Sequence, residues 1–191
     1  MTDDNVSFNW QKPFIIWVAN IKQQKRPELF VELAKEFSSK EIDFLMVGKI
    51  QDEAYNWLKN KTNLSSNLYY LGSKSFEEVN GIIKESLFHV HTCTKEGFPN
   101  IFIQAWLSGK ATVSFGFDPS NYIRDYKLGF FSEENWRKFV NDVERMYLLK
   151  EERKELNSNS KSFAEEMFSI EKSVSKLEEV IHKLISDRGT L

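Results

Sequence analysis

The segment FIIWVANIKQQKRPELFVELAKEF, residues 14–37, contains a strand, a loop and a helix in immediate succession. Phe14 to Ala19 is a strand-length run of apolar, β-favouring residues. The helix expected from about Pro27 to Phe37 has a proline suited to its first turn. It places five apolar side chains on one face: Leu29, Phe30, Leu33, Ala34 and Phe37. We predict that this helix packs on a sheet to which the strand belongs.

Five further short apolar runs follow, and longer stretches of helical period separate them. The predicted strands are Phe14 to Ala19, Asp43 to Val47, Leu68 to Leu71, Leu87 to His91, Ala111 to Ser114 and Leu128 to Phe131. The other predicted helices are Asp52 to Lys61, Phe76 to Lys84 after an N-capping Ser75, and one from Pro99, in its first position, to a stop at Gly109. Beyond residue 132 the pattern is helical throughout.

This alternation is typical of a parallel sheet with crossover helices. We therefore expect an α/β fold, a doubly wound, Rossmann-like parallel sheet of about six strands in the order 3-2-1-4-5-6, with a helical C-terminal tail. In such a sheet, ligands bind beyond the carboxyl ends of the strands, where the strand order reverses. That order places the loop after strand one, Asn20 to Arg26, beside the loop after strand four, Thr92 to Pro99.

The C-terminal tail has an apolar stripe at alternating spacings of four and three residues: Ile170, Val174, Leu177, Ile181 and Leu184. This spacing predicts an amphipathic helix. We expect the stripe to dock against its own domain, and the alternative is that it binds a partner.

Length and composition favour one domain over residues 1–191, with residues 1–12 as an N-terminal extension and 132–191 as a helical C-terminal part. The net charge of −2, with both signs interspersed, argues against a nucleic-acid partner. No apolar run approaches the roughly 20 residues that span a bilayer. The acidic, polar start of the chain is unlike a secretory signal, so we expect a cytoplasmic protein; contact with a membrane surface is left open. A single cysteine, Cys93, cannot form an internal disulfide.

The loop after strand one carries Lys22, Lys25 and Arg26 at the start of a helix, where backbone amides and the helix dipole favour an anion. A phosphate suits this position, and the alternative is that these are solvated surface charges. In the loop after strand four, Gly97 lets a ligand approach backbone amides closely. Placing the carboxylate of Glu96 near a phosphate is energetically costly unless the carboxylate accepts hydrogen bonds, and sugar hydroxyls are natural donors. The alternative is a simple helix-start residue.

Three stretches carry a family resemblance: WVANIKQQKRPELF at residues 17–30, NLYYLGSKSFEEV at 67–79 and EGFPNIFIQAWLSGKATVS at 96–114. From about Pro13 to the C-terminus, the sequence resembles the C-terminal, donor-binding domain of the group 1 (family 4) glycosyltransferases, which have the GT-B fold. The resemblance implies a nucleotide-diphosphate sugar of UDP or GDP type as donor substrate, transfer with retention, and no metal or other cofactor. It also implies an acceptor-binding domain, absent from this sequence, acting in cis or in trans.

The resemblance assigns two catalytic residues. The family's lysine that matches Lys25 neutralises the donor diphosphate, helped by an arginine where this sequence has Asn20. Of two family glutamates separated by seven residues, the first matches Glu96 and holds the donor sugar's hydroxyls. The second, which holds the ribose, is replaced by Gln104, whose amide accepts a hydrogen bond without the charge.

Further donor-binding residues are expected around these. Lys22 or Arg26 would compensate for the cation absent at Asn20. The start of the fourth helix would present its amides to phosphate and sugar, at Gly97, Phe98, Pro99, Asn100 and Ile101. The ribose and base would be lined by Gly48, Lys49, Leu71 and Lys74.

The sequence leaves three alternatives to a donor domain to consider. A non-catalytic module that keeps the fold and binds a nucleotide sugar or a partner stays open, because the arginine and the second glutamate are missing. A doubly wound signalling domain would need acidic residues after strand one, where this loop is basic, and a dinucleotide-dependent dehydrogenase would need a Gly-x-Gly-x-x-Gly there. His89 and His91 alternate along strand four and are expected to be structural; with one cysteine and three histidines, the sequence predicts no metal site.

Overall fold

The computed structural model describes residues 8–60, 65–169, 174, 178–182 and 185. Within these residues, six parallel strands form one sheet in the order β3-β2-β1-β4-β5-β6. They are β1 (Phe14–Val18), β2 (Asp43–Val47), β3 (Leu68–Tyr70), β4 (His89–His91), β5 (Thr112–Ser114) and β6 (Gly129–Phe131). Each strand lies inside a predicted run, so the fold class and the strand order are confirmed.

Helices connect the strands and complete the chain. The α-helices are α1 (Pro27–Glu36), α2 (Phe76–Glu85), α3 (Asn100–Leu107), α4 (Tyr122–Asp125), α5 (Trp136–Leu148) and α6 (Lys150–Met167). Short 3₁₀ helices are η1 (Gln23–Lys25), η2 (Glu53–Lys59) and η4 (Pro119–Asn121). Ser75 is the N-cap of α2, as predicted, and it forms a full capping box with Glu78.

Two predicted helices differ in detail. The segment expected as a helix from Asp52 to Lys61 is the 3₁₀ helix η2, and Lys61 lies outside the described residues. Its single buried side chain, Leu58, does not provide the apolar face that stabilises an α-helix. Pro99 is the N-cap of α3 rather than its first residue, because its backbone is extended (ψ 127°).

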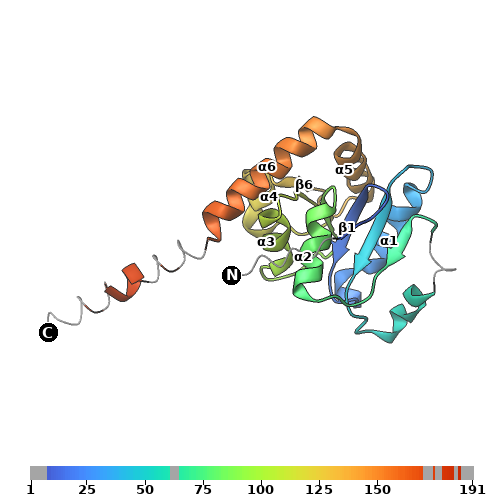
Figure 1. Cartoon of the computed structure of the whole chain (residues 1–191), viewed down its shortest axis with the longest axis horizontal. Coiled ribbons are helices and arrows are strands. Elements are labelled where there is room, and N and C mark those ends of the chain that lie inside the picture. Colours follow the sequence, from blue (N-terminus) through green and yellow to red (C-terminus); the bar gives the residue numbers. More distant parts are fainter. Residues whose placement is uncertain (1–7, 61–64, 170–173, 175–177, 183–184, 186–191) are drawn as a thin grey trace.

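Helices cover both faces of the sheet (Figure 1). Alternate residues of the strands face two separate apolar layers. Ile15 and Trp17 of β1 face α1 and α5, where Phe30 and Phe139 are buried. Phe14 and Ile16 face α2 and α3 on the opposite side of the sheet. Burial on both faces explains why the strands are continuous apolar runs. The arrangement leaves the carboxyl edge of the sheet for polar loops.

The prediction that the apolar stripe of the C-terminal tail docks on the domain is wrong at the two stripe residues that the structure describes. Val174 is 48% exposed and Ile181 is 45% exposed, while Ile170, Leu177 and Leu184 lie outside the described residues. The domain surface at α3 and β6 is covered instead by α6, through side chains such as Phe163.

Candidate functional site

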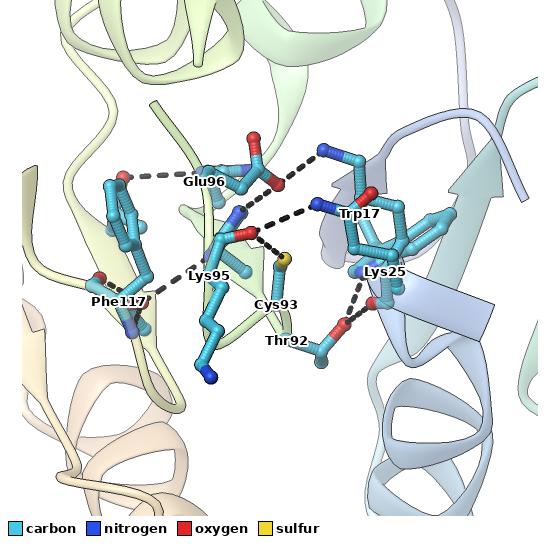
Figure 2. A network of polar contacts seen from close by, with 12 residues as sticks. Trp17, Lys25, Thr92, Cys93, Lys95, Glu96 and Phe117 are labelled. Carbon is cyan, nitrogen blue, oxygen red and sulfur yellow. Dashed lines mark hydrogen bonds and ion pairs between the residues drawn. The ribbon is translucent and has the colours of Figure 1, made fainter. Parts of the chain in front are cut away.

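The loops after β1 and β4 meet at the carboxyl edge of the sheet, where the strand order reverses (Figure 2). The Gln24 side chain donates from Nε2 to the carbonyl of Lys95 over 3.0 Å. The Thr92 hydroxyl donates to the carbonyl of Lys25 over 2.6 Å. The predicted adjacency of the two loops is therefore confirmed, and hydrogen bonds fix one loop against the other.

Thr92 also ties this junction to the sheet. The indole nitrogen of Trp17, buried in β1, donates to the Thr92 hydroxyl over 2.8 Å. Since a hydroxyl has one hydrogen, and Thr92 gives it to Lys25, its oxygen is free to accept from Trp17. The backbone at Lys25 is thus positioned by a chain of hydrogen bonds that starts inside the core.

Lys25 and Glu96 form an ion pair across the junction, with Nζ of the lysine donating to Oε1 of the carboxylate (Figure 2). The Lys25 side chain is 19% exposed and that of Glu96 is 8% exposed. The two residues predicted to carry the chemistry come from loops 71 positions apart in sequence. The structure brings them into direct contact at a partly desolvated position.

His91, the last residue of β4, is a second donor to Glu96. Its Nε2 lies 3.2 Å from the same Oε1 atom, and its Nδ1 lies 3.4 Å from Ser114 Oγ on β5. The Ser114 hydroxyl donates to the carbonyl of Phe117 over 2.5 Å. His91 was expected to be structural, and its contact with Glu96 places it in the candidate site as well.

These contacts set the charge of the carboxyl. Burial raises the pKa of Glu96, but the hydrogen bonds and charges of His91 and Lys25 outweigh it and lower the pKa to about 2. Burial lowers the pKa of His91, against the opposing effect of Glu96. Glu96 is therefore a carboxylate at neutral pH, oriented by two donors, and can accept hydrogen bonds from a polar ligand.

The other residues of the loop after β1 lie around this pair. Asn20 is exposed directly after the strand, and Lys22 is half-buried. Arg26 adopts a left-handed backbone (φ 50°) between η1 and α1, and its guanidinium lies 5.0 Å from the centre of the Phe115 ring. Arg26 thus contacts Phe115, the residue directly after β5, while Lys25 is the cation that reaches the carboxylate.

The loop after Glu96 is open. A Cβ atom added to Gly97 would meet nothing within 4 Å, and Phe98 is 39% exposed, with Tyr122 and Phe168 beside its ring. Pro99 and Ile101 are half-buried and Asn100 is exposed; further along α3, Gln104 is half-buried. The loop therefore leaves free space at the Cβ position of Gly97, the residue that follows Glu96.

The residues predicted to line a ribose and base pocket lie at the neighbouring strand ends. Gly48 N donates to Gly72 O over 2.9 Å, which brings the loops after β2 and β3 together. Leu71 is half-buried, whereas Lys49 and Lys74 are exposed. They continue the carboxyl edge of the sheet beyond β1.

Other kinds of site find little support in the described ranges. No cluster of three or more His, Cys, Asp and Glu side chains that could hold a metal ion occurs there. His89 is fully buried and contacts Thr112 Oγ1 at 3.2 Å, consistent with its predicted structural role. No helix in this part of the chain is long and apolar enough to cross a membrane.

Four residues of the junction were missed or assigned differently by sequence reasoning: Trp17, Gln24, His91 and Thr92. Gln24, His91 and Thr92 are within or directly next to the two loops, so adjacency to Lys25 and Glu96 was the available signal for them, whereas Trp17 lies inside β1. Their roles depend on pairing across the β1–β4 junction, which residue types alone do not indicate.

The comparison with known families settles what kind of protein this is. Residues 3–163 match the family model described as "Glycosyl transferases group 1". The chain belongs to the group 1 glycosyltransferases. A glycosyltransferase of Methanocaldococcus jannaschii named as uncharacterized is 26% identical over 170 residues, which is 82% of this chain and 41% of the relative.

Solved structures of glycosyltransferases share the fold. TarM of S. aureus superposes with a TM-score of 0.74 at 20% identity, over 94% of this chain and 37% of TarM. HepE of Anabaena, in complex with UDP and glucose, superposes with a TM-score of 0.75 at 15% identity, over 90% of this chain and 49% of HepE. The sheet and these matches confirm the resemblance to a GT-B domain, and the chain spans less than half the length of these relatives.

Proposed function

We propose that this chain is the nucleotide-sugar-binding part of a retaining glycosyltransferase and that it acts with an acceptor-binding domain in cis or in trans. The observation that carries the proposal is the Lys25–Glu96 ion pair at the strand-order reversal. It combines a cation for a diphosphate and a carboxylate for sugar hydroxyls within one contact.

Donor binding exchanges the partners of this pair. The diphosphate takes the Lys25 ammonium, and sugar hydroxyls donate to the Glu96 carboxylate, so both charges keep partners in the complex. The solved relatives agree with such a ligand, since TarM was crystallised with UDP and HepE with UDP-glucose.

The chemistry assigned to this chain is the stabilisation of the leaving diphosphate. The bond from the anomeric carbon to the diphosphate oxygen breaks, and a bond to the acceptor oxygen forms on the same face of the sugar. The departing phosphate oxygen takes the acceptor's proton. Lys25 and the amides at Gly97 and Phe98 offset the negative charge that develops on the diphosphate.

A second candidate function is a module that binds a nucleotide sugar without transferring it. The observation in its favour is that Asn20 and Gln104, where the family has an arginine and a glutamate, are both neutral. The two candidates share the binding site and differ in turnover.

The test is calorimetry of the purified chain with UDP, GDP, UDP-glucose, UDP-N-acetylglucosamine and GDP-mannose. We expect one nucleotide sugar to bind, and Glu96→Gln to weaken it by about 1 to 2 kcal/mol while leaving the bare diphosphate unaffected. The control is Glu32→Gln, which removes an exposed carboxylate on α1. Binding of none of the five compounds would contradict the proposal.

Turnover separates the two candidates. The isolated chain is expected to hydrolyse its donor slowly and to transfer no sugar, because a complete site forms only when two domains close over donor and acceptor. Robust transfer by the purified chain alone would contradict the need for a second domain. Donor binding with no hydrolysis, even when an acceptor-binding domain is added, would favour the non-catalytic module.

A further inference from the structure

The two donors on Glu96 are held very differently. The imidazole of His91 is 6% exposed, with the ring centres of Phe102 and Phe117 at 4.7 Å and 6.0 Å. Lys25 reaches the carboxylate through a flexible four-carbon side chain that is 19% exposed. Lys25 can therefore move to a ligand, whereas His91 is fixed by its packing.

The hydrogen bonds define which form of His91 faces the carboxylate. An ionised carboxylate accepts and cannot donate, so the 3.2 Å contact requires a hydrogen on His91 Nε2. On the other side of the ring, the Ser114 hydroxyl lies 2.5 Å from the Phe117 carbonyl oxygen and 3.4 Å from Nδ1, so this contact does not require a second proton on the ring. The neutral ring thus carries its proton on Nε2, and Nδ1 is left as the acceptor atom.

Both donors contact the same oxygen of the carboxylate. Lys25 Nζ and His91 Nε2 both approach Oε1. If Lys25 leaves Oε1 for a diphosphate, the hydrogen bond from His91 persists and still fixes the plane of the carboxylate.

We propose that His91 is a positioning residue that keeps the Glu96 carboxylate aimed at the donor sugar after Lys25 has moved to the diphosphate. This inference rests on the proposed function, since it assigns the partners that Lys25 and Glu96 exchange. It predicts that His91 matters for the sugar part of the donor and not for the diphosphate.

The chain offers a matched control in His89. It lies two residues earlier in the same strand and is fully buried, and its ring contacts Thr112 rather than Glu96. A substitution at His89 therefore disturbs the same strand without removing a donor from the carboxylate.

Binding is measured by calorimetry for UDP and GDP and for whichever of UDP-glucose, UDP-N-acetylglucosamine and GDP-mannose binds the unaltered chain most tightly. His91→Phe preserves the ring packing, and we expect it to weaken the nucleotide sugar roughly tenfold with its diphosphate unchanged. His91→Gln, whose amide nitrogen can occupy the position of Nε2, restores most of the affinity. His89→Gln leaves the ratio of the two affinities unchanged.

Three outcomes of this experiment overturn the inference. They are an equal loss of both ligands in His91→Phe, no loss of either, and no recovery in His91→Gln. If the unaltered chain binds none of the nucleotide compounds, the proposed function fails and the inference fails with it. Binding by the unaltered chain without the selective loss overturns the role of His91 alone.

A spectroscopic test needs neither a ligand nor a folded variant at His91. Long-range ¹H–¹⁵N spectra of the unaltered chain at pH 7 are expected to show one histidine with a protonated Nε2 whose ¹⁵N shift changes in Glu96→Gln. The shifts of His89 stay unchanged in that variant. A proton on Nδ1 of the responding ring, or no ring that responds to Glu96→Gln, overturns the inference.

Discussion

The carboxyl edge of the sheet is built in two ways on the two sides of β1. Between β1 and β4, side chains that are mostly buried or half-buried join the loops through an ion pair and several hydrogen bonds. Between β1, β2 and β3, the loops meet mainly through backbone atoms, with one hydrogen bond of 2.8 Å from the Tyr70 hydroxyl to the Gly48 carbonyl. Lys49 and Lys74 are exposed there. The β1–β4 side therefore holds a charged pair that is already assembled without a ligand. The β1–β2–β3 side offers mainly backbone atoms.

The backbone character of the β1–β2 side gives the largest expected effect. Gly48 has φ of 153°, and a Cβ there would lie 1.8 Å from the carbonyl oxygen of Ala19. Gly48→Ala is expected to lower the free energy of unfolding by about 3 kcal/mol or more, because backbone must move to relieve the clash. Urea denaturation measures it. Gly97→Ala is the control, since its Cβ meets nothing within 4 Å, and a similar loss there would break the comparison.

The charged character of the β1–β4 side predicts a dependence on pH. The pKa of Glu96 is lowered from 4.5 to about 2, so its stabilisation is present above about pH 4.5 and is lost as the pH falls toward 2. We expect the unfolding free energies of the unaltered chain and Glu96→Gln to differ by about 2 to 3 kcal/mol at pH 7 and to converge in that window. Glu32→Gln removes half of an exposed ion pair and should give a small difference throughout. A difference in unfolding free energy between the unaltered chain and Glu96→Gln that does not change with pH would contradict the prediction.

The two sides should also differ in binding. Lys25→Ala is expected to weaken the binding of UDP or GDP by about 1 to 3 kcal/mol, the range for a charge-assisted hydrogen bond. Lys49→Ala and Lys74→Ala remove exposed lysines at the other strand ends and should cost less than about 1 kcal/mol each. Calorimetry with the three variants ranks the two sides. An undiminished affinity in Lys25→Ala would remove Lys25 from the diphosphate site.

The smallest expected effect is a gain. Gln104 is half-buried on α3 at the position of the family's second glutamate. Gln104→Glu is expected to strengthen the binding of both the nucleotide diphosphate and the nucleotide sugar by about 1 kcal/mol. The reason is that a carboxylate accepts a hydrogen bond from a ribose hydroxyl more strongly than an amide does. Gln51→Glu, which places the same change in the loop after β2, is the control for added charge. No change in affinity would show that Gln104 does not contact the ribose.

The sequence was most informative where one residue type has one physical use. The six strands were predictable because runs such as Phe14 to Ala19 are apolar on both faces, as parallel strands buried by helices must be. The proximity of Lys25 and Glu96 was predictable because the strand order places their loops side by side. Which cation would face Glu96 depended on the path of the loop, which turns at Arg26 through a left-handed backbone.

What could not be predicted depends on contacts between segments far apart in sequence. His91 and His89 look equivalent in an alternating strand, and they differ because Glu96 lies beside one ring and Thr112 beside the other. The apolar spacing near residue 174 predicted docking, but Val174 and Ile181 are exposed, while α6 covers the domain through Phe163. Periodicity shows that a helix has an apolar face and not which surface, if any, covers it.

Through the hydrogen bond from Trp17 to Thr92, a buried indole is connected to the junction of the loops after β1 and β4. The Trp17 indole is 1% exposed, and its acceptor is the same hydroxyl that donates to the carbonyl of Lys25. Exchange of the indole hydrogen with solvent requires the junction to open, so its rate reports on the β1–β4 loops without any attached label. A ligand that bridges the two loops slows that exchange, and one that binds elsewhere on the domain leaves it unchanged.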